Sequence, residues 1–143
     1  DFNNIQVIAI AGKNEKMKED FEKLVEEKHK ETSVKVLSFT NMVPELMAIS
    51  DLVITKPGGL TTSESLASHL PLIVINPIPG QEEENAEFLE NFGCGVWLKK
   101  KDNVSSVLSS VLENEDKLNE MRENSIKLAK PNSTEDICKM IFS

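Results

Sequence analysis

Short apolar runs alternate along this chain with longer stretches of helical periodicity, and this alternation restricts the fold more than any single motif. The strands are expected at residues 5–11, 34–39, 52–55, 72–75 and 95–98. The helices are expected at residues 15–28, 44–49, 61–68, 82–92, 103–112, 116–129 and 133–142. Alternating strands and helices build a parallel sheet covered by helices on both faces. The chain therefore predicts a three-layer α/β fold in which ligands bind beyond the carboxyl ends of the strands.

The charge and composition exclude several classes of partner. The formal net charge is −8, and no cluster of Lys or Arg marks a groove for a phosphate backbone, so we expect no nucleic acid. Adhesion of this segment to an anionic membrane is disfavoured for the same reason, and no run of ~18 apolar residues could cross a bilayer. The isolated Cys94 and Cys138 predict reduced thiols in a cytosolic protein.

The 143 residues suffice for one domain with a substantial core, and we expect residues 1–143 to form a single domain. The chain starts at Asp1 without an initiator methionine or a signal pattern, and it enters a strand almost at once. This start indicates a piece cut from a longer protein.

Two polar clusters follow neighbouring strands, and each precedes a helix. The first contains Gly58 and Gly59 after Lys56. A glycine pair between a strand and a helix exposes backbone N–H groups to an anion such as a diphosphate, although a tight turn that needs glycine is an equal alternative. Lys56 either neutralises phosphate charge or is a solvated lysine, which we favour slightly.

The acidic and amide side chains of these clusters each have two interpretations. Glu64 is placed to bind a ribose diol, but Thr61 and Glu64 also have the spacing of a helix-capping box, and the local pattern favours the cap. Gln81 and Glu82 start a helix, where acidic residues complement the helix dipole, and they can also reach the hydroxyls of a sugar. No Ser-His-Asp arrangement, metal-ligand cluster or pair of carboxylates stands out, so we predict no catalytic residue, metal or cofactor in this chain.

Three stretches of the sequence resemble one family. They are Asp51–Glu64, Pro79–Ala86 and Asn91–Gly95, and together with Ala11–Glu15 the resemblance covers essentially the whole chain. The sequence resembles the C-terminal half of the lipid glycosyltransferases that add glucose or galactose to diacylglycerol. These include processive diacylglycerol glucosyltransferases and monogalactosyldiacylglycerol synthases, which are related to the N-acetylglucosaminyltransferase of peptidoglycan synthesis.

The resemblance implies two Rossmann-like domains facing each other across a cleft, the GT-B arrangement, with the UDP-sugar held by the C-terminal domain. It assigns Glu64 to the ribose diol, which replaces the capping interpretation. It assigns the backbone of residues 58–61 to the diphosphate, and Gln81 and Glu82 to the sugar. The residues that it implies for donor binding are Phe39, Thr40, Val43, Gly58, Gly59, Leu60, Thr61, Glu64, Gln81 and Glu82, of which Phe39 and Thr40 hold uracil with Val43 nearby.

The chain departs from the family pattern in two places. The family's domain opens with a further strand and a glycine-rich phosphate loop, and this chain begins one βα unit later. We therefore expect part of the diphosphate site to be absent and a strand edge to be exposed. Ser68–Pro71 replaces the family's usual small residue before proline, which affects the geometry of that helix end.

The function that the resemblance implies is donor binding in an inverting glycosyltransferase that uses UDP-glucose or UDP-galactose. The diacylglycerol acceptor, the general base and the membrane contact would belong to the missing N-terminal domain, so the fragment alone should not turn over. The full protein would be cytoplasmic and peripheral at the inner face of the cell membrane. The alternatives are a peptidoglycan N-acetylglucosaminyltransferase, a sugar-nucleotide-binding module without transferase activity, and a UDP-sugar 2-epimerase.

Overall fold

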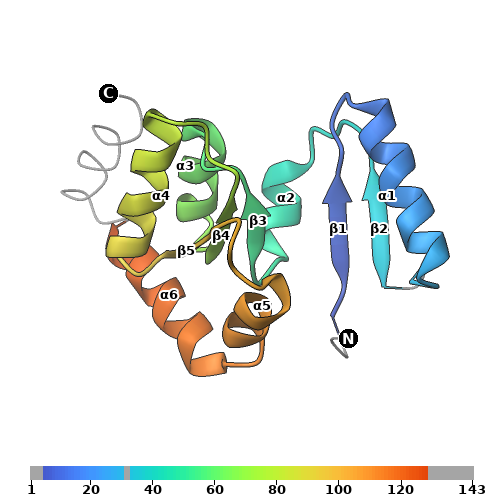
Figure 1. Cartoon of the computed structure of the whole chain (residues 1–143). Coiled ribbons are helices and arrows are strands. Elements are labelled where there is room, and N and C mark those ends of the chain that lie inside the picture. The colour runs from blue at the N-terminus through green and yellow to red at the C-terminus, as the bar shows by residue number, and fades with distance from the viewer. Residues whose placement is uncertain (1–4, 31–32, 129–143) are drawn as a thin grey trace. The chain divides into compact units, whose positions relative to one another are not determined.

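The computed structural model describes residues 5–30 and 33–128, and the chain divides into two compact units, residues 1–43 and 44–143. The first unit contains β1 (Val7–Ile10), α1 (Glu15–Glu27) and β2 (Val34–Leu37). The two strands pair in parallel, with Val7 opposite Val34, and α1 packs on β2 (Figure 1). This is the expected strand–helix–strand order, although the first strand is shorter than predicted.

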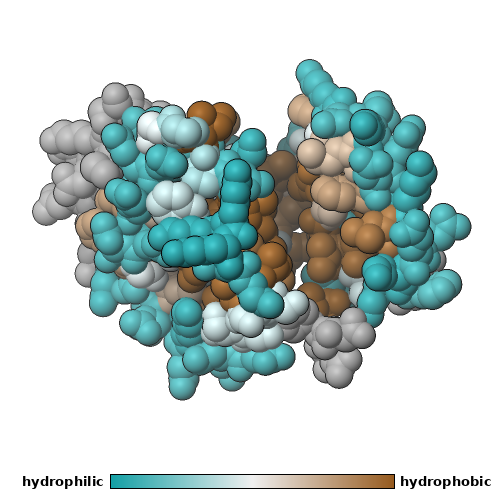
Figure 2. Space-filling model, viewed as in Figure 1, coloured by the Kyte–Doolittle hydropathy of each residue, from teal (hydrophilic) through white to brown (hydrophobic). Residues whose placement is uncertain are grey.

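The apolar residues of the first unit are less covered than the sequence indicates. The apolar first strand would suit a buried position, but Val7, Ile8 and Ile10 are 44%, 40% and 39% exposed. The apolar residues of α1 are also incompletely covered, since Leu24 is 53% exposed. One helix covers only one face of a two-stranded sheet, and the β1 side chains form part of the apolar surface of this unit (Figure 2).

The second unit contains a three-stranded parallel sheet in the order β3-β4-β5. The short helix α2 (Val43–Ala48) begins at Val43, the last residue of the first unit, and its remaining residues belong to the second unit. The strands and helices that follow are β3 (Val53–Thr55), α3 (Gly59–Ala67), β4 (Leu72–Ile75), α4 (Gln81–Asn91), β5 (Gly95–Leu98), α5 (Val104–Leu112) and α6 (Glu115–Leu128). Their order confirms the predicted alternation, and the predicted helix at 133–142 lies outside the described residues.

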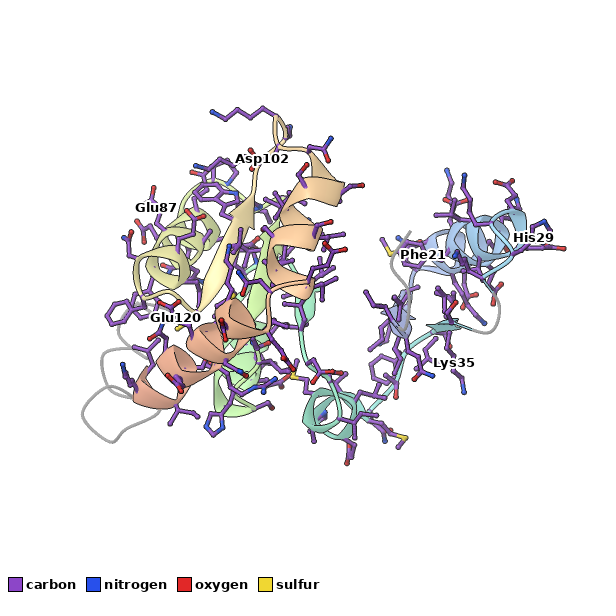
Figure 3. All side chains as sticks on the ribbon, turned by 90° about the horizontal axis from the view of Figure 1, so that it is seen from below. Phe21, His29, Lys35, Glu87, Asp102 and Glu120 are labelled. Atoms are coloured by element: carbon purple, nitrogen blue, oxygen red, sulfur yellow. The ribbon has the colours of Figure 1, made fainter. Side chains whose placement is uncertain are left out.

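The central strand β4 divides the core of the second unit into two layers. Leu72 and Val74 face a cluster with residues of α3 and α4, whereas Ile73 packs with residues of α5 and α6. All three side chains are fully buried, as expected for a parallel strand covered on both faces. Helices therefore lie on both faces of this sheet (Figure 1), and Glu87 points outward from α4 (Figure 3).

Gly93 directly follows Phe92, the C-cap residue of α4. Its φ is +71°, and a Cβ there would lie 2.6 Å from Nδ2 of Asn124, which donates a hydrogen bond to the Gly93 carbonyl. The backbone conformation therefore favours glycine here, and a Cβ would have to displace the Asn124 amide. The turn passes directly into β5 beside β4.

Within residues 5–30 and 33–128, no helix has the length and apolar character needed to span a membrane. The same part of the chain contains no group of three or more His, Cys, Asp or Glu side chains suited to a metal ion.

Candidate functional site

The turn between β3 and α3 leaves several backbone donors without an acceptor. Gly58 is the N-cap of α3, its N–H donates to the Lys56 carbonyl at 2.9 Å, and its own carbonyl accepts from the Thr62 N–H at 2.9 Å. The N–H groups of Gly59–Thr61 have no acceptor among the described residues. Free N–H groups at the positive end of a helix dipole are the usual backbone site for an anion.

The capping box that the local sequence pattern favours does not form. The helix begins at Gly59, two residues before the expected start, so Thr61 is the third helical residue and not the cap. The Thr61 carbonyl accepts a hydrogen bond from Oγ of Ser65 at 2.8 Å. The half-buried Glu64 carboxylate makes no hydrogen bond or ion pair within the described part of the chain, so it is available to a ligand.

Two hydroxyl groups near the start of α3 were missed by the sequence analysis. Oγ1 of Thr62 and Oγ of Ser63 are buried and have no hydrogen-bond partner among the residues that the structure describes. A buried hydroxyl without a partner costs about 1–3 kcal/mol. No sequence signal separates such groups from the helical Ser and Thr residues that bond to a preceding carbonyl.

The turn between β4 and α4 also ends in a glycine N-cap. Gly80 has φ +103° and makes no side-chain cap, and its carbonyl accepts from the Glu84 N–H at 3.1 Å. Oε1 of Glu82 accepts from the Ile78 N–H at 3.1 Å, so this carboxylate holds the turn in place. Nε2 of Gln81 donates to Oδ1 of Asn85 at 3.1 Å. Both predicted sugar-binding side chains thus already have partners inside the second unit.

Asn85 links these two turns. It lies on the buried side of α4 at 1% exposure, and its Nδ2 donates to the Pro57 carbonyl at 2.9 Å. The structure therefore brings the segment that contains Gly58 and Glu64 close to the start of α4 with Gln81 and Glu82. An amide at a core position of an otherwise apolar helix face was the one sequence signal for Asn85, and it does not reveal the partner.

A cavity of about 290 Å³ lies at the ends of β4 and β5, and none of the predicted site residues lines it. Its walls include Asn76 and Pro79 after β4, Glu83 in the first turn of α4, and Trp97 in β5. Nζ of Lys99 lies 5.0 Å from the centre of the Trp97 ring, which leaves that ring partly covered.

The predicted uracil-binding residues belong to the end of the first unit. Phe39 is 67% exposed, and Nζ of Lys13 lies 5.5 Å from its ring centre. Oγ1 of Thr40 accepts from the Met42 N–H at 3.1 Å, and Val43 starts α2. The role of these three residues in donor binding stays a prediction.

Cys94 does not supply a nucleophile. Burial raises the pKa of its thiol from 9.0 to about 11, and a hydrogen bond with Ser125 lowers it by a smaller amount. A thiol with this pKa stays protonated near neutral pH, and the thiolate is the reactive form.

The glycosyltransferase family 28 C-terminal domain matches residues 2–139, so the chain belongs to this family. Its relatives include the processive diacylglycerol beta-glucosyltransferase of Bacillus subtilis (strain 168), which is 37% identical over 140 residues. The protein of the same name from Staphylococcus epidermidis (strain ATCC 12228 / FDA PCI 1200) is 39% identical over 137 residues. The matches cover 98% and 95% of this chain but 36% and 34% of these relatives, so the chain spans about a third of their length.

Two solved structures share the fold. WaaG, a glycosyltransferase involved in lipopolysaccharide biosynthesis, superposes with a TM-score of 0.73 at 19% identity, covering 98% of this chain and 39% of WaaG. HepE of Anabaena, solved in complex with UDP, gives a TM-score of 0.72 at 18% identity, covering 99% of this chain and 40% of HepE. These matches confirm the predicted α/β fold of the C-terminal half of a GT-B glycosyltransferase.

Proposed function

We propose that this chain is the donor-binding half of an inverting glycosyltransferase that transfers glucose or galactose from a UDP-sugar to diacylglycerol. The observation that carries the proposal is the start of α3, where three consecutive N–H groups and the Glu64 carboxylate lack partners among the described residues. Donors and a carboxylate within the first two turns of one helix suit a diphosphate attached to a ribose. The names of the relatives supply the lipid acceptor, and the UDP complex of HepE supports the nucleotide.

In this proposal the first two turns of α3 bind the nucleotide. The N–H groups of Gly59–Thr61 donate to the diphosphate, and Glu64 accepts from the ribose hydroxyls. Gln81 and Glu82 contact the sugar. Phe39 and Thr40 contact uracil, and Val43 packs nearby.

The reaction is a direct displacement at the anomeric carbon by the acceptor hydroxyl. As the bond to the sugar breaks, negative charge grows on the departing UDP, and the free N–H groups of α3 stabilise it without a metal. The base that accepts the acceptor's proton, the diacylglycerol and the main membrane contact belong to the other domain. The complete protein then works as a cytoplasmic enzyme peripheral at the inner face of the cell membrane.

Calorimetric titration of the chain with UDP, UDP-glucose, UDP-galactose and UDP-N-acetylglucosamine tests the proposal. We expect binding of UDP and tighter binding of one of the two hexose donors than of UDP-N-acetylglucosamine. Tighter binding of UDP-N-acetylglucosamine would favour the peptidoglycan enzyme class, and no binding of UDP would refute the proposed site.

The ribose assignment has its own test in Glu64→Ala. Hydrogen bonds to a charged group are worth about 1.5–3 kcal/mol, so we expect UDP to bind about 10–100-fold more weakly. UDP with a 2′,3′-dideoxyribose should bind the variant and the unaltered chain equally. Glu87→Ala is the matched control, because Glu87 is an exposed helical glutamate on the outer side of α4 (Figure 3).

A further inference from the structure

One peptide group at the start of the candidate site is held from both sides. The Pro57 carbonyl and the Gly58 N–H belong to the same planar peptide unit. The carbonyl accepts from Nδ2 of Asn85 at 2.9 Å, and the N–H donates to the Lys56 carbonyl at 2.9 Å. The orientation of this peptide sets the direction in which the chain enters α3.

The sequence around this peptide does not fix its orientation. Gly58 has φ −68° and ψ 149°, which any residue can adopt, and a Cβ there would meet no atom within 4 Å. Two consecutive glycines leave a wide choice of backbone conformations. A hydrogen bond from elsewhere in the fold is therefore needed to select one conformation.

Asn85 is suited to this task because both ends of its amide are used. Its Oδ1 accepts from Nε2 of Gln81 at 3.1 Å, while its Nδ2 reaches the Pro57 carbonyl across 28 residues of sequence. The side chain is 1% exposed and its bond to the Pro57 carbonyl is buried, so water does not compete for that bond. The same amide thus orients the α3 turn and the Gln81 side chain.

We propose that Asn85 is a positioning residue that fixes the Pro57–Gly58 peptide and Gln81 relative to each other, so that diphosphate and sugar bind in one defined geometry. The effect of Asn85 on binding of the UDP-sugar rests on the proposed function. Its effect on the orientation of the Pro57–Gly58 peptide does not rest on it, so the two effects can be tested separately.

The substitution Asn85→Asp is the sharpest test because it changes one atom and keeps the shape. An ionised aspartate has no donor and would place its charge against the Pro57 carbonyl oxygen. A protonated aspartate donates an O–H to that carbonyl and still accepts from Gln81. Burial favours the neutral form, so lowering the pH should restore the bond that the substitution removes.

Asn124→Asp is the matched control. Nδ2 of Asn124 also donates to a distant carbonyl, that of Gly93 at 3.2 Å across 31 residues, but at the other end of α4. The control loses an equivalent bond without touching the α3 turn. Neighbouring carboxylates such as Glu64, Glu82 and Glu84 are present in every variant, so each affinity is taken as a ratio to the unaltered chain at the same pH.

The experiment measures UDP and UDP-hexose affinity by calorimetry at pH 5 and pH 7.5, and the Gly58–Thr61 amide signals by NMR. We expect Asn85→Asp to bind the UDP-hexose on the order of tenfold more weakly at pH 7.5. Most of this loss should disappear at pH 5. The Gly58 amide should shift and exchange faster at pH 7.5 in Asn85→Asp only, and Asn124→Asp should leave affinity and amide signals unchanged.

Equal effects of the two substitutions, or a loss in Asn85→Asp that is the same at both pH values, would overturn the proposal. If the unaltered chain binds no UDP, the proposed function fails, and the Gly58 amide alone decides the role of Asn85. An unchanged Gly58 amide signal in Asn85→Asp at pH 7.5 then refutes that role.

Discussion

Five of the described helices, α1 and α3 to α6, begin in two different ways. An asparagine side chain caps three of them: Asn14 bonds to the Met17 N–H at 3.0 Å, Asn103 to the Ser106 N–H at 3.0 Å, and Asn114 to the Lys117 N–H at 3.1 Å. In contrast, α3 and α4 begin at Gly58 and Gly80, which supply no side-chain cap. Each asparagine satisfies one of the first N–H groups of its helix, whereas in α3 the N–H groups of Gly59–Thr61 all lack an acceptor among the described residues.

The largest effect on UDP affinity is expected when α3, which begins at a glycine without a side-chain cap, is given a capping side chain. In Gly58→Asp the aspartate can adopt the backbone angles of Gly58, and its Cβ meets no atom within 4 Å. Its carboxylate can accept hydrogen bonds from the free N–H groups of α3, and its negative charge repels a diphosphate. We expect UDP to bind at least tenfold more weakly, because hydrogen bonds to charged groups contribute about 1.5–3 kcal/mol. Calorimetry measures the affinity, and thermal melting should show a fold as stable as before or slightly more stable. Unchanged UDP affinity would mean that α3 does not bind the diphosphate.

A second substitution separates the two glycine caps from each other. Gly80 has φ +103° and ψ −122°, a conformation that costs a residue with a side chain about 1–3 kcal/mol. We expect Gly80→Ala to lower the free energy of unfolding by that amount in a urea titration. Gly58→Ala is the control, since its backbone angles suit alanine, and it should cost less than about 1 kcal/mol. Equal losses would show that the difference in φ does not govern stability at these positions.

The smallest effect is expected when a capped start loses its cap. Asn103→Ala removes the bond to the Ser106 N–H and should destabilise the chain by about 1 kcal/mol. Asn103→Gly should cost only a few tenths of a kcal/mol. Both variants should bind UDP with the affinity of the unaltered chain, measured by calorimetry under conditions where they are folded. A loss of UDP affinity in the folded variants would contradict the division between helices that begin at a glycine beside the candidate site and helices capped by an asparagine.

The sequence predicts the parts of the fold that depend on local pattern. Apolar runs such as Leu72–Ile75 identify the strands because a fully covered parallel strand is apolar on both faces. The same rule fails for Val7–Ile10, where burial depends on neighbouring elements and not on the strand itself. Pattern therefore gives the type and order of elements more reliably than their burial.

In the candidate site, too, local features could be predicted from the sequence and long-range contacts could not. The glycine pair was found from its place between a strand and a helix, but the start of α3 at Gly59 was missed, because Thr61 and Glu64 have the spacing of a capping box. The link from Asn85 to Pro57 could not be predicted, since it joins residues 28 positions apart through side-chain geometry. Contacts of this range follow from the packed structure and leave no local signature.

The thiol of Cys94 provides the second unit with an internal reporter of its own opening. It is fully buried, packs with Leu72, Leu89 and other core residues, and has its pKa raised to about 11 by burial. Alkylating reagents react with exposed thiolate, so modification of Cys94 requires the layer between α4 and β4 to separate. The rate of its labelling in a Cys138→Ser background therefore measures how often this half of the core opens under native conditions.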